Sequence, residues 1–265
     1  MAAVVWKRFR RSVKKNRRAF LDGEPDGLHD FRVALRRLAT IADSAGRGRL
    51  ARDARRVAGR FSPLRQLEVD RLQLRSLVED GLLSASAATT IDERLRLEIA
   101  RRRKKAERTL AGSRVRGLVR RLRKTRAEPD AKLKRRLRKA TIRPLGLPAG
   151  PLDDETLHKL RLRVKRMRYR LETRRALGEN GLDATIAGLR KRQDLLGEFN
   201  DLLLFSRDLR RLRRAAAAEG VVTQVTNIDA ALDLLRPRTA AARQAAVSSL
   251  PSRGPAEAIS APFSR

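Results

Sequence analysis

A histidine stands at the head of a regularly spaced basic row in the stretch "LHDFRVALRRL", residues 28–38. His29 is followed by Arg32 and Arg36 at steps of three and four residues. These steps place side chains on one face of a helix, roughly 5 Å apart along its axis. A parallel apolar stripe lies one residue earlier and predicts a core-facing seam, formed by Leu28, Phe31, Leu35 and Leu38. The row therefore flanks a buried seam and can contact several groups of a linear anion at once.

The same arrangement recurs in "LHKLRLRVKRM", residues 157–167. His158 is followed by Arg161 and Lys165, and Arg168 extends the row by one more step. Its apolar stripe consists of Leu157, Leu160, Val164 and Met167. His29 and His158 are the only histidines in the chain, and 129 residues separate them. This spacing predicts an internal duplication.

Both histidines are expected near the start of a helix, where free backbone N–H groups and the helix dipole favour anions. A nearby polyanion would favour the imidazolium form, which donates two hydrogen bonds and loses its charge as the pH rises. We expect no bound metal, because no His, Cys or acidic residue lies at ligand spacing around either histidine. A capping role inherited with the repeat is the structural alternative.

The composition is strongly basic. The 265 residues hold 64 basic and 30 acidic side chains, a net charge of +34, and 52 of the basic residues are arginines. The planar guanidinium binds phosphate oxygens in a bidentate manner, so this surplus indicates an anionic partner. Composition leaves one alternative open. The protein could come from an arginine-rich proteome, and its basic rows could be solvated helix faces without a ligand.

Other residue types narrow the classes of function. Aromatic residues make up 3% of the chain, which leaves few platforms for stacking nucleobases. There is no cysteine, and no apolar run is long enough for a signal peptide or a membrane span. The expectation is a cytoplasmic protein without a membrane span.

The apolar spacing is helical almost throughout, and only "GVVTQVT" at 220–226 has the alternation of a strand. We therefore predict an all-α fold, with single helices over ranges such as 48–80 and 86–111. A first helical half covers about 1–130, a linker about 131–152 and a second helical half about 153–249. The residues from 250 to 265 are predicted to be a disordered tail.

On these motifs the chain resembles the CHAD domain, the conserved-histidine α-helical domain of proteins associated with inorganic polyphosphate. The two histidine stretches resemble its paired signatures, and "LLGEFNDLLLF" at 195–205 resembles the motif that follows in the second half. The resemblance covers about residues 1–250. It implies two four-helix bundles related by a pseudo-two-fold axis, with basic side chains of both halves on one shared surface.

Residue by residue, the resemblance implies polyphosphate-binding roles for nine side chains, with supporting roles for Tyr169 and Asp201. The nine are His29, Arg32, Arg36, Arg37, His158, Arg161, Lys165, Arg166 and Arg168. For Tyr169 we favour packing over ligand contact. The chain departs from the family at Ala39, where arginine is usual, and at Gln66, where aspartate is usual. Both departures predict that the first half binds the anion less tightly.

The predicted function is non-catalytic binding of long-chain inorganic polyphosphate, with polyphosphate or other storage granules as a location. Binding of an RNA or DNA backbone is the alternative, since phosphate contacts need no aromatic side chains. No cofactor is expected. Neither a phosphate-binding G-x-x-x-x-G-K-[ST] loop nor the E-x-E-x-K run of the metalloenzymes often fused to CHAD domains occurs here. We read the acidic Asp153, Asp154 and Glu155 as a helix start.

Overall fold

The computed structural model describes residues 2–24, 26–126, 128–141 and 152–250. Over these residues the chain forms ten helices and no strand, which confirms the predicted all-α class. The helices are α1 Ala2–Leu21, α2 Gly27–Ser44, α3 Gly48–Arg60, α4 Ser62–Glu79, α5 Ala85–Ala111, α6 Ser113–Arg123, α7 Asp130–Thr141, α8 Asp154–Ala176, α9 Asp183–Ala218 and α10 Val222–Ser248. The predicted tail from 251 onward lies outside the described residues.

The starts of α2 and α8 follow from local chemistry. Before α8, the Asp153 side chain accepts a hydrogen bond from the Thr156 backbone N–H at 2.8 Å. Two acidic residues in the first turn of α8 interact favourably with the positive end of the helix dipole. At the start of α2 the chain passes so close to α1 that a Cβ atom on Gly27 would lie 2.7 Å from the Phe20 backbone nitrogen. Gly27 therefore allows α2 to pack directly against the end of α1.

The structure corrects three expectations about the elements. The helix predicted over 48–80 is broken at Phe61, and α4 begins with Pro63 in its first turn, a position that proline favours. The segment 220–226, which has the alternation of a strand, instead enters α10. The expected linker begins with α7, whose Leu133 and Leu137 are buried in the protein core; residues 142–151 lie outside the described part of the chain.

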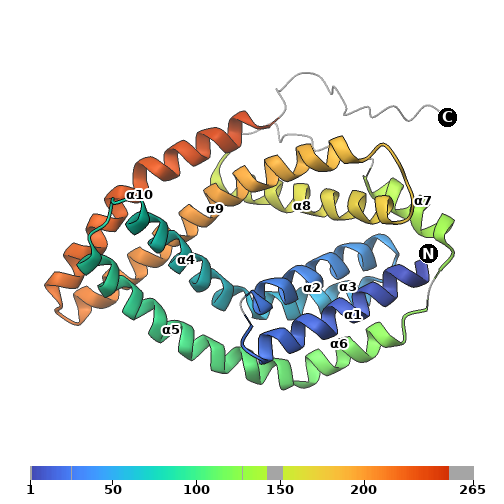
Figure 1. The fold of residues 1–265 in the computed structure, drawn as a ribbon, viewed down its shortest axis with the longest axis horizontal. Coiled ribbons are helices and arrows are strands. Elements are labelled where there is room, and N and C mark those ends of the chain that lie inside the picture. The colour runs from blue at the N-terminus through green and yellow to red at the C-terminus, as the bar shows by residue number, and fades with distance from the viewer. Residues whose placement is uncertain (1, 25, 127, 142–151, 251–265) are drawn as a thin grey trace.

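The apolar side chains form two cores, and neither core is built from one continuous stretch of sequence. Figure 1 shows how the helices that carry them are arranged. One core unites α1, α2, α3, α6 and α7 with the end of α5, and Trp6 and Phe31 are fully buried in it. The other unites most of α4 and the start of α5 with α8, α9 and α10, around residues such as Phe205 and Ile228. Helices from the first part of the sequence thus complete the core of the second.

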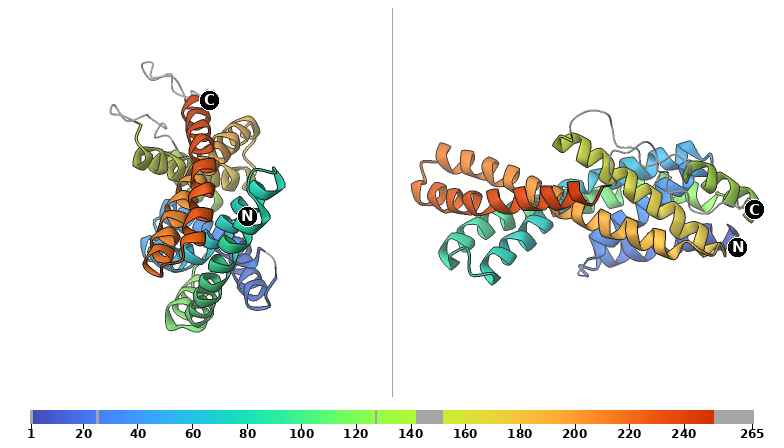
Figure 2. Two further views of the ribbon diagram at one scale, coloured as in Figure 1. Left: turned by 90° about the vertical axis from the view of Figure 1, so that its left-hand side faces the viewer. Right: turned by 90° about the horizontal axis from the view of Figure 1, so that it is seen from above.

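Figure 2 shows an elongated molecule in which α4 and α5 reach from one core to the other. Helix α2 belongs to the first core and α8 mainly to the second, and the two helices pack against each other. The contact between the cores therefore lies where the two basic rows run. The internal two-fold repeat and the division into halves at 131–152 stay predictions.

Candidate anion-binding site

The packing of α2 against α8 brings the two basic rows together. On α2, Arg32 and Arg36 are partly buried, and on α8 so are Arg161 and Lys165. The charge of Arg161 reaches both α2 arginines and lowers their pKa values. The charge of Lys165 likewise reaches His29 at the start of α2. Rows that are 129 residues apart in sequence thus form one site.

Arg65 of α4 completes this site, and no sequence motif had singled it out. Burial lowers the pKa values of both His29 and Arg32, and the charge of the nearby Arg65 lowers them further. The nearest signal in the sequence was the neighbouring Gln66, where a departure from the family pattern was noted. We call the following six side chains the cationic cluster: His29, Arg32, Arg36, Arg65, Arg161 and Lys165.

Burial and mutual repulsion both act against the charges of the cluster. Burial, followed by the charges of Arg36 and Arg65, lowers the pKa of Arg32 to about 9. Burial, followed by the charges of Arg161 and Arg36, lowers the pKa of Lys165 to about 7. The guanidinium groups remain charged at neutral pH. Lys165 is the member of the cluster that can lose its proton and so reduce the repulsion among the positive charges.

Few carboxylates balance the cluster. Asp201 of α9 lies 3.5 Å from the Arg161 guanidinium, and Glu68 lies 3.2 Å from that of Arg65. Among the described residues, no carboxylate forms an ion pair with Arg32, Arg36 or Lys165. The site therefore keeps a local surplus of positive charge that an anion can neutralise.

Two hydrogen-bond donors of the cluster have no partner. The Nε atoms of Arg32 and Arg161 are buried and make no hydrogen bond among the described residues. The Arg32 Nη2 atom does donate to the Ser62 hydroxyl at 3.0 Å. Gly197 of α9 lies against Arg161, where an added Cβ atom would be 3.8 Å from Nε. Buried donors without partners cost free energy, so an anion that accepts their hydrogen bonds would recover it.

The second histidine is held by a chain of hydrogen bonds. Its Nδ1 lies 2.8 Å from the Asn200 side-chain oxygen, while the Asn200 amide donates to Asp201 at 3.2 Å. Since that oxygen can only accept, His158 must donate from Nδ1, which leaves Nε2 for a ligand. The ion pair between Asp201 and Arg161, at 3.5 Å, connects these hydrogen bonds to the cationic cluster.

The remaining predicted residues lie in other surroundings. Arg37 and Arg168 both form ion pairs with Glu172, at 3.1 and 2.8 Å, and each lies 5.2 Å from the centre of the Tyr169 ring. Tyr169 is buried between them, as expected for a packing role. Arg166 is exposed beside Arg170, whose guanidinium donates to the Ser44 hydroxyl and the Ala140 carbonyl. Arg37, Arg166 and Tyr169 are therefore not brought into the cluster, whereas the charge of Arg168, one turn from Lys165 on α8, contributes to lowering the pKa of Lys165.

Comparison with known proteins identifies the architecture. The model of the CHAD domain family matches residues 3–210. The chain belongs to the CHAD domain family. No curated protein sequence matches it.

Two solved structures resemble this CHAD domain. One is the CHAD domain from the plant Ricinus communis, with a TM-score of 0.67 and 20% identity over 93% of this chain and 90% of that one. Another is PptA from Streptomyces chartreusis, with a TM-score of 0.66 and 16% identity over 94% of this chain and 98% of that one. At these identities the likeness shows a shared fold.

The two departures from the family pattern have structural consequences. Ala39 is buried in the first core, where it packs among apolar side chains and does not extend the basic row. The Gln66 amide donates at 2.8 Å to the buried carboxyl of Asp70. Burial, together with the nearby carboxyl groups of Asp208 and Asp201, raises the pKa of Asp70 to about 8, although the hydrogen bond from Gln66 acts in the opposite direction. The Gln66 side chain is thus engaged by a hydrogen bond to a buried carboxyl group of its own helix, α4.

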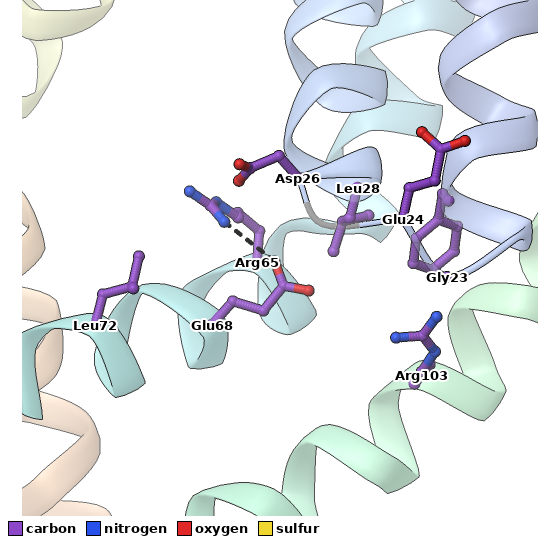
Figure 3. A pocket seen from close by; sticks show the side chains of 9 residues that line it. Gly23, Glu24, Asp26, Leu28, Arg65, Glu68, Leu72 and Arg103 are labelled. Carbon is purple, nitrogen blue, oxygen red and sulfur yellow. Dashed lines mark hydrogen bonds and ion pairs between the residues drawn. The ribbon is translucent and has the colours of Figure 1, made fainter. Parts of the chain in front are cut away.

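A pocket of mixed charge adjoins this site (Figure 3). Arg65 lines it and points toward Glu68, and the Arg103 guanidinium lies over the Phe20 ring at 5.6 Å from its centre. Glu24 and Asp26 supply two further carboxylates. The carboxylates make this pocket less favourable for a polyanion than the cationic cluster.

The described ranges contain neither a metal-binding cluster nor a membrane-spanning helix. No group of three or more His, Cys, Asp or Glu side chains is placed to hold a metal ion. None of the helices found there is long and apolar enough to cross a bilayer.

Proposed function

We propose that this CHAD domain binds long-chain inorganic polyphosphate, without catalysis, in the contact between α2 and α8. The observation that carries the proposal is the convergence of two basic rows on partly buried positions, with no carboxylate paired to Arg32, Arg36 or Lys165 among the described residues. A polymer with a charge on every unit can engage both rows at once. Family membership supports the same ligand class.

The surroundings of the aromatic side chains favour phosphate over nucleobases. Of the described aromatic residues, all are buried except Phe9, which is partly buried on α1, away from the cationic cluster. Proteins that bind single-stranded nucleic acids usually stack bases on accessible rings. A site of guanidinium, ammonium and imidazole groups without an accessible aromatic ring is suited to phosphate, so we expect a polymer made only of phosphate to fit it best.

The site is proposed to bind and not to hydrolyse its ligand. The nearest carboxylates, Asp201 and Glu68, are each engaged by an arginine. We expect no release of orthophosphate when the protein is incubated with polyphosphate and Mg²⁺ or Mn²⁺. Because one long polymer can bind several copies of the protein, the proposal also places it at polyphosphate granules.

Calorimetric titration with tripolyphosphate, medium and long polyphosphate at equal phosphate concentration tests the proposal. We expect affinity to rise with chain length and to fall steeply with salt, as it does for proteins that release counterions from nucleic acids. Arg161→Gln should weaken binding by about 10-fold or more, because a charge-assisted hydrogen bond contributes about 1.5–3 kcal/mol. Arg52→Gln changes an exposed residue of α3 and is the matched control.

Duplex and single-stranded RNA serve as competitors at the same phosphate concentration. Polyphosphate should displace RNA from the protein at a lower concentration than the reverse. Tighter binding of RNA, no gain in affinity beyond three phosphates, or equal losses in Arg161→Gln and Arg52→Gln would each contradict the proposal.

A further inference from the structure

Lys165 differs chemically from the other members of the cationic cluster. At neutral pH arginine keeps its proton and is a poor nucleophile, whereas the lysine amine becomes a nucleophile once it is neutral. Lys165 is partly buried on α8, and neither a hydrogen bond nor an ion pair holds its ammonium group among the described residues. Its amine therefore has no counterion that would keep it protonated.

The groups that face Lys165 are almost all positive. Arg161 and Arg168 come from its own helix, one turn away on either side, and Arg36 and His29 approach from α2. Asp201 of α9 is the carboxylate that opposes them, and it lies 3.5 Å from Arg161. Desolvation and cationic neighbours are the two features that make an enzyme lysine nucleophilic at neutral pH. Consistent with this geometry, the pKa of Lys165 falls to about 7.

The same guanidinium groups can hold a small phosphate-bearing reagent beside the amine. Arg36 and Arg161 lie close enough to shift the pKa of Lys165, and the Arg161 Nε donor has no partner. Guanidinium groups bind phosphate through charge-assisted hydrogen bonds. A reagent that joins a phosphate to an electrophilic carbonyl would thus be held near the amine.

We propose that Lys165 is a modification site that accepts an acyl group from small acyl phosphates bound by the neighbouring guanidinium groups. The neutral amine attacks the carbonyl carbon, an N–C bond forms, and the C–O bond to phosphate breaks. The phosphate leaves with the bonding electron pair, and the amine releases one proton to solvent. The product is an uncharged acyl-lysine, which removes one positive charge from the cationic cluster.

The expected selectivity follows from the amine's protonation. At pH 7.5 an amine with a pKa of about 7 is mostly neutral, against about one in a thousand for an ordinary lysine. Its lower basicity reduces intrinsic nucleophilicity by about 30-fold if a Brønsted coefficient of about 0.4–0.5, known for thiols, applies to amines. The larger neutral fraction and the lower nucleophilicity together leave Lys165 about 20-fold more reactive than an ordinary lysine.

The test is site-resolved acetylation of the full chain by acetyl phosphate at pH 7.5, with initial rates measured for each of the 12 lysines by mass spectrometry. Lys159 is the internal control, since it lies on the same helix, is exposed and forms an ion pair with Glu155 at 2.7 Å. We expect Lys165 to react more than about 20-fold faster than Lys159, because phosphate binding by the guanidinium groups adds to the effect of the neutral amine. A rate equal to or below that of Lys159 would overturn the proposal.

A phosphate-free donor, N-acetoxysuccinimide, separates the neutral amine from the binding of phosphate. Lys165 should again react fastest, by a smaller ratio, and its rate should reach half its maximum near pH 7. No advantage with this donor would refute the neutral amine and overturn the proposal. Arg36→Gln removes a neighbouring positive charge and should slow Lys165 by at least 3-fold, about 0.7 kcal/mol, whereas Arg52→Gln should leave the rate unchanged.

Polyphosphate added before the donor distinguishes this proposal from the proposed function. Protection of Lys165 supports both. Rapid acetylation that polyphosphate does not slow would support the modification site and contradict polyphosphate binding in the cationic cluster. Slow acetylation of a protein that still binds polyphosphate would contradict the modification site and leave the proposed polyphosphate binding supported.

Discussion

Replacing Lys165 with methionine should make the protein more stable while weakening its binding of polyphosphate. The substitution keeps an unbranched side chain of similar length and removes the charge. In the folded protein, burial and the neighbouring arginines lower the pKa of Lys165 from 10.5 to about 7. This corresponds to about 4–5 kcal/mol against the charged form. Because the side chain is partly exposed and water screens part of the repulsion, we expect a gain of about 1–3 kcal/mol.

The pH dependence gives this prediction a definite sign. Between about pH 7 and pH 10.5 the unfolded chain holds more protons at Lys165 than the folded protein does, so the free energy of unfolding of the wild type should rise with pH in this window. The Lys165→Met variant lacks this contribution. Its advantage over the wild type should therefore be largest at or below pH 7 and should shrink toward pH 10.

Urea denaturation at pH 6, 7.5, 9 and 10 in low salt measures the effect, and Lys159→Met is the matched control. Lys159 is exposed and forms an i,i+4 ion pair with Glu155, so its loss should cost no more than about 0.5 kcal/mol. A Lys165→Met variant that is less stable than the wild type at pH 6 and pH 7.5 would refute the reasoning. So would an advantage that does not change with pH.

Two further substitutions test other parts of the structure. Gly27→Ala should destabilise the protein by about 2 kcal/mol or more, because the new Cβ would lie 2.7 Å from the Phe20 backbone nitrogen, whereas Gly188→Ala, with nothing within 4 Å, should stabilise it by about 0.5–1 kcal/mol in thermal unfolding. Equal effects would contradict the close approach of α1 and α2. For Asp70, whose pKa is raised from 3.8 to about 8, the folded state holds the proton that the unfolded chain releases, so stability should fall from about pH 4 to pH 8. Asp70→Asn should reduce that fall in denaturation curves at pH 5 and pH 8, and an unchanged pH profile would show that Asp70 is ionised in the fold.

Much of the helical structure was predictable, because apolar periodicity records which face of each helix is buried. The α-helical class and the family are confirmed, and the two histidine rows do lie on helices. The break at Phe61 was missed although Ser62 and Pro63 are a recognised helix start. The strand-like alternation at 220–226 does not produce a strand, because the apolar residues of α10 pack against α5 and α9 with helical spacing.

The candidate site was less predictable, because it depends on which helices meet. Steps of three and four placed Arg161 and Lys165 on one face, but only the packing of α2 against α8 brings them beside Arg36. Arg65 comes from α4, outside both histidine motifs, and its one local signal was the neighbouring Gln66, where the chain departs from the family pattern. Residues one position away from the row, such as Arg166, point into other surroundings, since each step along a helix turns the side chain by about 100°.

The central claim is that the α2 and α8 rows form one site for a single chain, and binding stoichiometry tests it most directly. Native mass spectrometry with a monodisperse polyphosphate of medium length should show one chain per protein. Arg32→Gln on α2 and Arg161→Gln on α8 should each lower the affinity while the stoichiometry stays at one. Two chains bound per protein, with each variant abolishing one of them, would mean that the rows act as separate sites and would contradict the account.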